Sequence, residues 1–313
     1  MSWKINLIGF ALILSSCSNI KKEESTTSLT NDTSTSILIE ASELENYISQ
    51  SNYKLVDFRK KEDYDQGHID GALSMWRSDI EDSTYSYGGM MASKQQIEKL
   101  FSSLGISNLD TLIIYDDRGL CEAARLWWIL QNYDFENVKL LNGGYPAWLE
   151  NGGKPSIQTP AISQTAFSLN ESSSMKLYIA KEDVITHLNQ NVTLLDTRSV
   201  DEFTGGNHKK GAFKAGRIPN SIHIDWANAI EYNGNKKFKS TQELETIYSD
   251  LLEKKDSLII VYCHSGVRSA HTTFVLTQLL GFKNVKNYDG SWIEWSHFDE
   301  LEIEKDSLKT TNI

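Results

Sequence analysis

The stretch LIIVYCHSGVRSAHTTFVLTQLLG, residues 258–281, contains a transition from a strand to a helix. The apolar run 258–262 predicts a buried strand, and the pattern after residue 269 predicts a helix. Cys263 lies between them, at the start of a short polar loop. Strands that lead into helices form parallel sheets, whose ligands bind beyond the carboxyl ends of the strands. The cysteine is therefore placed where such a sheet binds its ligand.

The loop that follows the strand has the composition of a reactive site. A cysteine attacks as its thiolate, and the free N–H groups and positive dipole at a helix start stabilise that anion. Gly266 lets the loop curl so that N–H groups point inward, and Arg268 either orients an anionic substrate or braces the loop. The alternative is a buried, inert cysteine that ends a core strand. The polar residues after Cys263 favour a nucleophile.

Strand and helix patterns alternate along the chain. Apolar runs at residues 54–58, 111–115 and 138–141 predict strands, and the pattern at 116–132 predicts a helix. This alternation predicts an α/β fold in which mainly parallel sheets are covered by helices on both faces.

The chain also contains a long internal repeat. KLVDFRKKEDYDQGHIDGA at 54–72 is echoed by TLLDTRSVDEF at 193–203 and GRIPNS at 216–221, and segment 111–148 is echoed by 257–295. Matched order over this length indicates two similar domains in tandem. The predicted organisation is an N-terminal domain at 37–153, a linker at 154–175, a C-terminal domain at 176–302 and a tail at 303–313.

Composition sets limits on the function. A length of 313 residues is enough for about two domains. The net charge of −11, without a basic block, argues against nucleic acid as the main partner. The three cysteines are too few for a disulfide scaffold, and their spacing does not suit a zinc site.

The N-terminus reads as a targeting segment. The apolar run 5–14 follows a single lysine, is too short to span a membrane and fits a signal peptide. It ends in LSSC, which resembles a bacterial lipobox whose cysteine, Cys17, is lipidated; an ordinary secretory signal is the alternative. Residues 1–17 are thus predicted as a lipoprotein signal, and 18–36 as a flexible tether. The predicted location is the cell envelope of a bacterium, lipid-anchored outside the cytoplasm.

Residues 37–298 as a whole resemble the rhodanese family of sulfurtransferases in its tandem two-domain form. The resemblance is carried by the two Asp-x-Arg segments, the paired segments 67–72 and 216–221, and the loop 263–269. It implies five-stranded parallel sheets flanked by helices. It also implies a catalytic second domain and a first domain without a nucleophile, since Asp117 aligns with Cys263.

The resemblance also implies a chemistry. The Cys263 thiolate takes the outer sulfur of thiosulfate or 3-mercaptopyruvate, becomes a persulfide and passes the sulfur to a thiol or cyanide. The loop's N–H groups hold the persulfide, so neither a metal nor an organic cofactor is needed. The residues expected to bind the anionic donor are His264, Gly266, Val267, Arg268, Ser269, Lys214 and Arg217, with Lys209 and Lys210 adding positive charge or lying in a solvated loop.

A preference between donors is also predicted. In the mercaptopyruvate branch of the family a serine two residues after the cysteine joins a histidine and an aspartate of the first domain; Ser265, His68 and Asp57 match. The alternative is that His68 and Asp57 only brace the frame. Glu202 stands where that branch usually has an arginine for the carboxylate, which weakens the match. Both donors are therefore expected, with a lean toward mercaptopyruvate.

Two other functions fit parts of the pattern. Cysteine phosphatases of a related fold use a Cys-x5-Arg loop, but here Cys263 and Arg268 form the shorter Cys-x4-Arg, which suits one sulfur better than a phosphate. A non-enzymatic lipoprotein could use the same frame as a binding scaffold. Cys121 is interpreted as a small buried residue rather than a resolving thiol.

Overall fold

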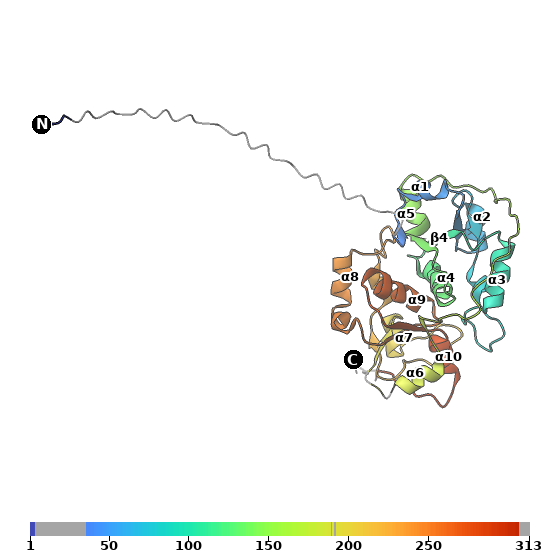
Figure 1. Cartoon of the computed structure of the whole chain (residues 1–313). Helices are drawn as coiled ribbons and strands as arrows, with labels where there is room; N and C mark the ends of the chain where they lie inside the picture. Colours follow the sequence, from blue (N-terminus) through green and yellow to red (C-terminus); the bar gives the residue numbers. More distant parts are fainter. Residues whose placement is uncertain (4–35, 189, 191, 307–313) are drawn as a thin grey trace. The chain divides into compact units, whose positions relative to one another are not determined.

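The computed structural model describes residues 1–3, 36–188, 190 and 192–306 (Figure 1). The predicted lipidation site, Cys17, and nearly all of the predicted signal peptide and tether lie outside these residues. In the part of the chain that is described, no helix is both long and apolar enough to cross a membrane.

The first domain is built on a five-stranded parallel sheet with strand order β1-β5-β4-β2-β3. The strands are β1 (Leu38–Ile39), β2 (Tyr53–Asp57), β3 (Leu73–Ser74), β4 (Thr111–Tyr115) and β5 (Val138–Leu141). The helices are α1 (Leu44–Ile48), α2 (Lys61–Gln66), α3 (Lys94–Ser103), α4 (Cys121–Asn132) and α5 (Gly144–Glu150), with a 3-10 turn, η1, at Arg77–Ile80.

The second domain repeats this sheet in the order β6-β10-β9-β7-β8. Its strands are β6 (Tyr178–Ile179), β7 (Thr193–Asp196), β8 (Ile222–His223), β9 (Ile259–Tyr262) and β10 (Val285–Tyr288). Its α-helices are α6 (Lys181–His187), α7 (Val200–Thr204), α8 (Thr241–Ile247), α9 (Val267–Phe274) and α10 (Ser291–His297). Its other turns are η2 (Trp226–Ala229), η3 (Ser249–Lys254) and the π-helical η4 (Val275–Leu279) that extends α9. The predicted pair of five-stranded parallel sheets is confirmed.

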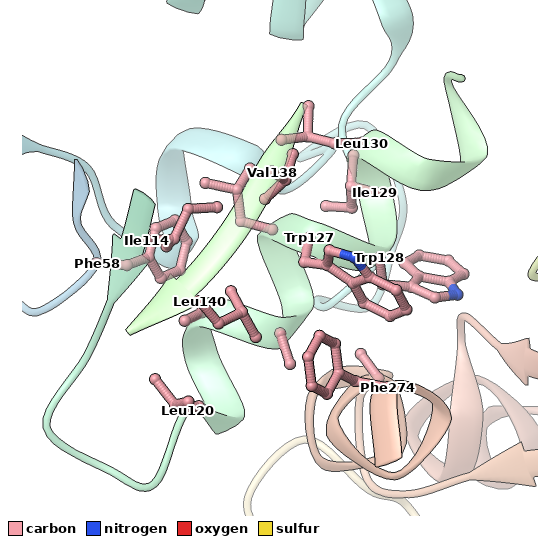
Figure 2. Packing of buried hydrophobic residues seen from close by; sticks show 14 of the residues in the cluster. Phe58, Ile114, Leu120, Trp127, Trp128, Ile129, Leu130, Val138, Leu140 and Phe274 are labelled. Atoms are coloured by element: carbon pink, nitrogen blue, oxygen red, sulfur yellow. The ribbon is translucent and has the colours of Figure 1, made fainter. Parts of the chain in front are cut away.

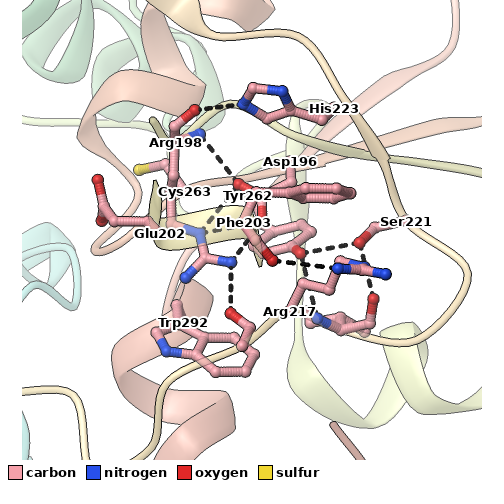
Figure 3. Close-up of polar contacts among 12 residues, drawn as sticks. Asp196, Arg198, Glu202, Phe203, Arg217, Ser221, His223, Tyr262, Cys263 and Trp292 are labelled. Atoms are coloured by element: carbon pink, nitrogen blue, oxygen red, sulfur yellow. Dashed lines mark hydrogen bonds and ion pairs between the residues drawn. The ribbon is translucent and has the colours of Figure 1, made fainter. Parts of the chain in front are cut away.

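The two Asp-x-Arg segments form the same buried structure at the end of β2 and of β7. In the second domain Arg198 donates from Nε to Asp196 Oδ1 at 2.9 Å, and from Nη2 to the Gly216 carbonyl at 2.8 Å (Figure 3). In the first domain Arg59 Nε donates to Asp57 Oδ1, also at 2.9 Å. Because these charges are buried, each pair needs its full set of hydrogen bonds. The repeated motif therefore fixes how the chain leaves the strand in both domains.

The two domains share one hydrophobic core. Helices α4 and α9, which follow the central strands of the two sheets, pack against each other, and the Trp127 and Phe274 rings meet edge to face at 4.9 Å (Figure 2). Trp127, Trp128 and Phe274 are fully buried in a cluster with residues of both domains. Such ring pairs add to the stability that burial itself supplies. This shared core places the N-terminal ends of α4 and α9 around one cavity.

The segment 154–175, predicted as a linker, packs against the first domain. Phe167 and Leu169 are buried in the shared core, and Ser156 pairs with His68 through two backbone hydrogen bonds, at 2.8 and 2.9 Å. Its polar composition concealed this packing, because the two buried residues are isolated among serines and threonines. The segment therefore connects the domains and also completes the first one.

Replacing Phe167 by alanine should destabilise the protein by about 3–5 kcal/mol, because it leaves a cavity in the core. The measurement is urea-induced unfolding. Ile157→Ala is the matched control in the same segment, since Ile157 is 74% exposed, and its effect should stay within about 0.5 kcal/mol. Equal effects of the two substitutions would mean that the segment does not pack as described.

Candidate active site

Cys263 directly follows β9, the central strand of the second sheet, and α9 begins four residues later at Val267. Its side chain is 1% exposed and lines a cavity of about 710 Å³. The walls come from both domains and include Arg77, Arg118, Cys121 and Glu122 from the first and Glu202, Lys209, Trp226, Tyr232, Lys236 and Arg268 from the second. The cysteine thus sits at the end of a parallel strand, where ligands of such sheets bind.

Gly266 gives the loop its shape. Its φ of +75° lies in the left-handed region, and a Cβ there would come within 2.7 Å of both Arg125 Nη1 and the Asp289 carbonyl oxygen. Below the loop, Ser291 Oγ accepts the backbone N–H groups of both Cys263 and Gly266 at 3.1 Å. Only glycine fits this position, because it tolerates the conformation and lacks the side chain.

The environment of the sulfur favours the thiolate. Burial, the largest effect, would raise the pKa of Cys263, but the charge of Arg268 and hydrogen bonds from Ser269 and Ser265 together lower it below its usual 9.0. The Ser269 hydroxyl donates to Sγ at 3.4 Å, and the backbone N–H groups of Ser269 and Ser265 also act on the sulfur. A thiolate held by donors in a cavity is a nucleophile ready to react.

Arg268 is held in place by Glu202. Its Nη1 and Nη2 donate to the two carboxylate oxygens at 2.7 and 2.9 Å. Burial would raise the pKa of Glu202, but the hydrogen bonds and charge of Arg268 lower it to about 2. The bidentate pair fixes the guanidinium plane. From the sequence, Glu202 is notable only because it stands where the mercaptopyruvate branch usually has an arginine. The structure shows that it is the partner of Arg268 in the loop.

His264 is neutral in this site at pH 7. Burial and the nearby charge of Arg268 lower its pKa to about 4. Its Nε2 lies 3.2 Å from the Lys210 carbonyl oxygen, so Lys210 contributes its backbone here, while the Lys209 side chain lines the cavity. Of the residues predicted to bind the donor, His264, Val267 and Arg268 line the cavity, Gly266 shapes the loop and Ser269 contacts the sulfur.

His68 does not join Ser265, and the prediction that it does is wrong. Its Nδ1 lies 2.9 Å from the Tyr64 carbonyl oxygen, its Nε2 lies 3.1 Å from the Gln158 carbonyl oxygen, and its ring stacks on Tyr64 at 3.8 Å. Ser265 lines the cavity, whereas His68 is buried inside the first domain and does not. Nε2 thus contacts the segment 154–175 and Nδ1 contacts α2, so both ring nitrogens are engaged away from Ser265.

Asp57 is likewise a frame residue, and its predicted catalytic role is wrong. Its carboxylate pairs with Arg59 and accepts the Tyr115 hydroxyl at 2.7 Å. It is completely buried and does not line the cavity. The predicted set of Ser265, His68 and Asp57 is therefore not assembled, which removes the reason for a lean toward mercaptopyruvate.

Lys214 and Arg217, predicted to bind the donor, also lie outside the cavity lining. Lys214 Nζ donates to the Phe298 carbonyl at 2.8 Å, and Arg217 Nε pairs with Glu304 at 3.2 Å. Arg217 occupies the repeat position of His68, and both residues hold the extended segment that follows their domain's last helix. The predicted tail thus begins as part of the second domain's frame.

The equivalent loop of the first domain holds a carboxylate where the second holds the sulfur. Asp116 directly follows β4, as Cys263 follows β9, and its carboxylate accepts four backbone N–H groups at 2.8–3.0 Å. The loop 116–120 is one residue longer than 263–266. This extra residue explains why the ungapped alignment of Asp117 with Cys263 is wrong. Burial raises the pKa of Asp116 to about 6.

Sequence reasoning missed the walls that the first domain contributes. Arg77, from the 3-10 turn after β3, donates from Nε to Glu122 Oε2 at 3.0 Å, and both residues line the cavity beside Cys121. The internal repeat could have indicated these walls, because it makes the start of α4 equivalent to the start of α9. In the described ranges, no group of three or more His, Cys, Asp and Glu side chains is arranged to hold a metal ion.

Both domains match a known protein family. The sequence signature of the rhodanese-like domain matches residues 40–151 and 180–298. The chain belongs to the rhodanese family. It is 34% identical over 262 residues to the thiosulfate sulfurtransferase of Corynebacterium glutamicum, covering 80% of this chain and 84% of that protein. It is 35% identical over 254 residues to the sulfur carrier protein TtuD of Thermus thermophilus, covering 77% of this chain and 87% of that protein.

A solved rhodanese supports the same fold. The crystal structure of SseA from Escherichia coli, described as a 3-mercaptopyruvate sulfotransferase, superposes with a TM-score of 0.72 at 26% identity. The match covers 82% of this chain and 99% of that one. The two-domain rhodanese arrangement therefore extends over nearly the whole of the solved protein.

The pH dependence of thiol alkylation should separate the two cysteines near the cavity. Reaction of Cys263 with iodoacetamide should rise with a midpoint below pH 9.0, because the thiolate forms below the usual pKa. Cys121 should react much more slowly, because burial and nearby acids raise the pKa of its thiol. His264 and Glu202, with pKa values of about 4 and about 2, do not titrate above pH 5.

Arg268→Gln should move the midpoint for Cys263 upward, because the charge that favours the thiolate is lost. Lys214→Gln is the matched control, since this cation lies in the same domain but not in the cavity lining. An equal shift in both variants would show that the site does not depend on Arg268. The measurement is the alkylation rate of each cysteine-containing peptide, followed by mass spectrometry across pH.

Proposed function

We propose that this protein is a sulfurtransferase in which Cys263 carries the sulfur as a persulfide and thiosulfate is the favoured donor. The single observation that supports this most strongly is the buried Cys263 sulfur, with a lowered pKa, at the base of a cavity lined with cations. Sulfur transfer is the activity named for its rhodanese relatives. The protein is thus an enzyme of the sulfurtransferase class.

The reaction has two displacement steps. The Cys263 thiolate attacks the outer sulfur of thiosulfate, a new S–S bond forms, and the donor's S–S bond breaks with its electron pair leaving on sulfite. An acceptor thiolate or cyanide then attacks the outer sulfur of the persulfide, and the Cys263 thiolate leaves. In both steps the hydrogen-bond donors around Sγ remain in place and compensate a negative charge, so little reorganisation is required.

Cations in the cavity support an anionic donor. The described residues that line the cavity include five cations, Arg77, Arg118, Lys209, Lys236 and Arg268, and four acids, Asp117, Glu122, Glu202 and Asp225, which gives the lining a small positive excess in a protein whose net charge is −11. Three of these cations are paired with acids of the same lining: Arg268 with Glu202, Arg77 with Glu122 and Arg118 with Asp117. A local concentration of positive charge attracts small anions and raises their rate of association. Thiosulfate needs cations and N–H donors, both of which are present, and its leaving group needs no proton.

Mercaptopyruvate is less well served. Its leaving enolate would benefit from a proton donor, but neither His68 nor Asp57 of the first domain assists Ser265, since both are bound elsewhere. Its carboxylate would need a cation where Glu202 stands, and Arg268 is paired with Glu202. We therefore place mercaptopyruvate second among the donors.

Phosphatase and scaffold functions are less consistent with the site. A phosphatase needs its loop arginine free to hold phosphate oxygens, whereas both terminal nitrogens of Arg268 donate to Glu202. A pure binding scaffold would not require a cysteine whose pKa is lowered against the cost of burial. Both features favour sulfur chemistry.

Cys263→Ser should lose sulfur transfer from thiosulfate to cyanide, because a serine hydroxyl is not ionised at neutral pH. Cys121→Ser is the matched control and should retain most of the activity. The measurement is thiocyanate formation by each purified protein, with folding checked by circular dichroism. Substantial turnover by Cys263→Ser would overturn the assignment. The wild-type kcat/KM should be higher for thiosulfate than for 3-mercaptopyruvate, and the reverse order would refute the donor preference.

We further propose that the mature protein is anchored outside the cytoplasm of a bacterium through a lipidated Cys17. The support is the sequence alone: a short apolar run that ends in LSSC, followed by a polar stretch. Fatty-acid labelling of cells should mark the wild-type protein and the Cys121→Ser control, and both should fractionate with membranes. A Cys17→Ala protein that is still labelled and membrane-bound would refute the anchor.

A further inference from the structure

A buried arginine of the first domain reaches the sulfur-binding loop of the second. Arg125, on α4, is 1% exposed, and its Nη2 donates to Asp289 Oδ1 at 2.6 Å and to the Gly89 carbonyl at 2.7 Å. Its Nη1 lies 3.4 Å from the Gly266 carbonyl oxygen, and its guanidinium lies over the Trp128 ring at 4.7 Å. One side chain of the non-catalytic domain thus contacts the loop that starts α9.

The partner of Arg125 is tied to both domains. Asp289 follows β10 in the second domain, directly before the turn that supports the loop. Its Oδ1 accepts Arg125, and its Oδ2 accepts the Met91 backbone N–H of the first domain at 2.9 Å. Both charges of this ion pair are almost fully buried. A buried pair is weak evidence for stability alone, because desolvation offsets much of its attraction.

Arg125 and its neighbours leave the loop little freedom. The Gly266 carbonyl accepts Asn287 Nδ2 at 3.0 Å in addition to its contact with Arg125. From the first domain, Gly89 packs so closely that a Cβ on it would lie 2.7 Å from the Cβ of Ser265. Ser265 is one of the residues whose N–H acts on the Cys263 sulfur. Contacts from the first domain therefore reach Ser265 itself and the Gly266 carbonyl that follows it.

We propose that Arg125 is a positioning residue: together with Gly89 it holds Ser265 and the Gly266 carbonyl so that the loop's N–H donors face the Cys263 sulfur. The inference rests on the proposed role of Cys263. It gives the first domain, which has a carboxylate in place of the nucleophile, a direct part in the site. We call the contacts of Arg125 and Gly89 with this loop the clamp. When the clamp is lost, the donors turn away from the sulfur and the thiolate is less stable, while the cavity's cations remain.

Two substitutions test the clamp from opposite sides. Arg125→Gln removes the charge and the long reach of the guanidinium, and Gly89→Ala leaves Arg125 in place but pushes on Ser265. Both should raise the pH midpoint of Cys263 alkylation. Both should lower kcat with thiosulfate on the order of 10²-fold, the usual cost of a reacting group displaced by about 1 Å. KM should change little, because Arg268 and Lys209 are untouched. Arg125→Lys, which keeps the charge without the fork of donors, should restore only part of kcat.

Arg59→Gln is the matched control. It breaks a buried ion pair of the same kind in the same domain, with side chains 4% and 0% exposed, that does not contact the loop. It should lower the urea midpoint and leave the alkylation profile unchanged. The clamp is overturned if Arg125→Gln lowers the urea midpoint but leaves both the alkylation profile and kcat as in the wild type. If Arg125→Gln does not fold, an unchanged profile in Gly89→Ala overturns it.

The alkylation profile does not require turnover. A wild-type protein with a low Cys263 midpoint but no sulfur transfer would refute the proposed function and leave the clamp open to the same test. A normal turnover in the wild type with no effect of either substitution would refute the clamp and leave the function intact.

Discussion

The negative charge of a buried thiolate must be balanced by cations or hydrogen-bond donors within a few ångströms, and the rest of the structure depends on this requirement. Burial alone would raise the pKa of Cys263, so the charge of Arg268 and the donors of Ser265 and Ser269 have to outweigh it. A short loop between the central strand and α9 supplies these groups, and only glycine fits at its turn. The shared core and the first domain's contacts through Arg125 and Gly89 act to hold that loop.

The tandem repeat explains how one fold serves two roles. Both domains carry the same Asp-x-Arg frame and the same strand-loop-helix unit, but the first fills its ring of N–H groups with the Asp116 carboxylate. A carboxylate that already accepts those donors leaves no place for a reacting anion. The first domain instead contributes cavity walls and, as we propose, a clamp on the catalytic loop through Arg125.

Sequence reasoning succeeded where local pattern decides structure. The central strands, the helices that follow them and the reactive loop follow from apolar runs, turn residues and the repeat, and the same repeat identified the family. The helix starts were less exact: the helices expected over 116–132 and after residue 269 begin at Cys121 and Val267. It failed for His68, Arg217 and Lys214, because alignment shows which positions are equivalent but not which way a side chain faces. The pair of Glu202 with Arg268 was equally hidden, since 66 residues separate its members.

The most direct test of the central claim is the mass of the protein after incubation with thiosulfate. The account predicts that the intact protein gains the mass of one sulfur atom, that the added sulfur maps to the peptide containing Cys263, and that cyanide removes it with release of thiocyanate. An active protein that gains no sulfur on Cys263 during turnover, or that carries it on Cys121 instead, would contradict the account.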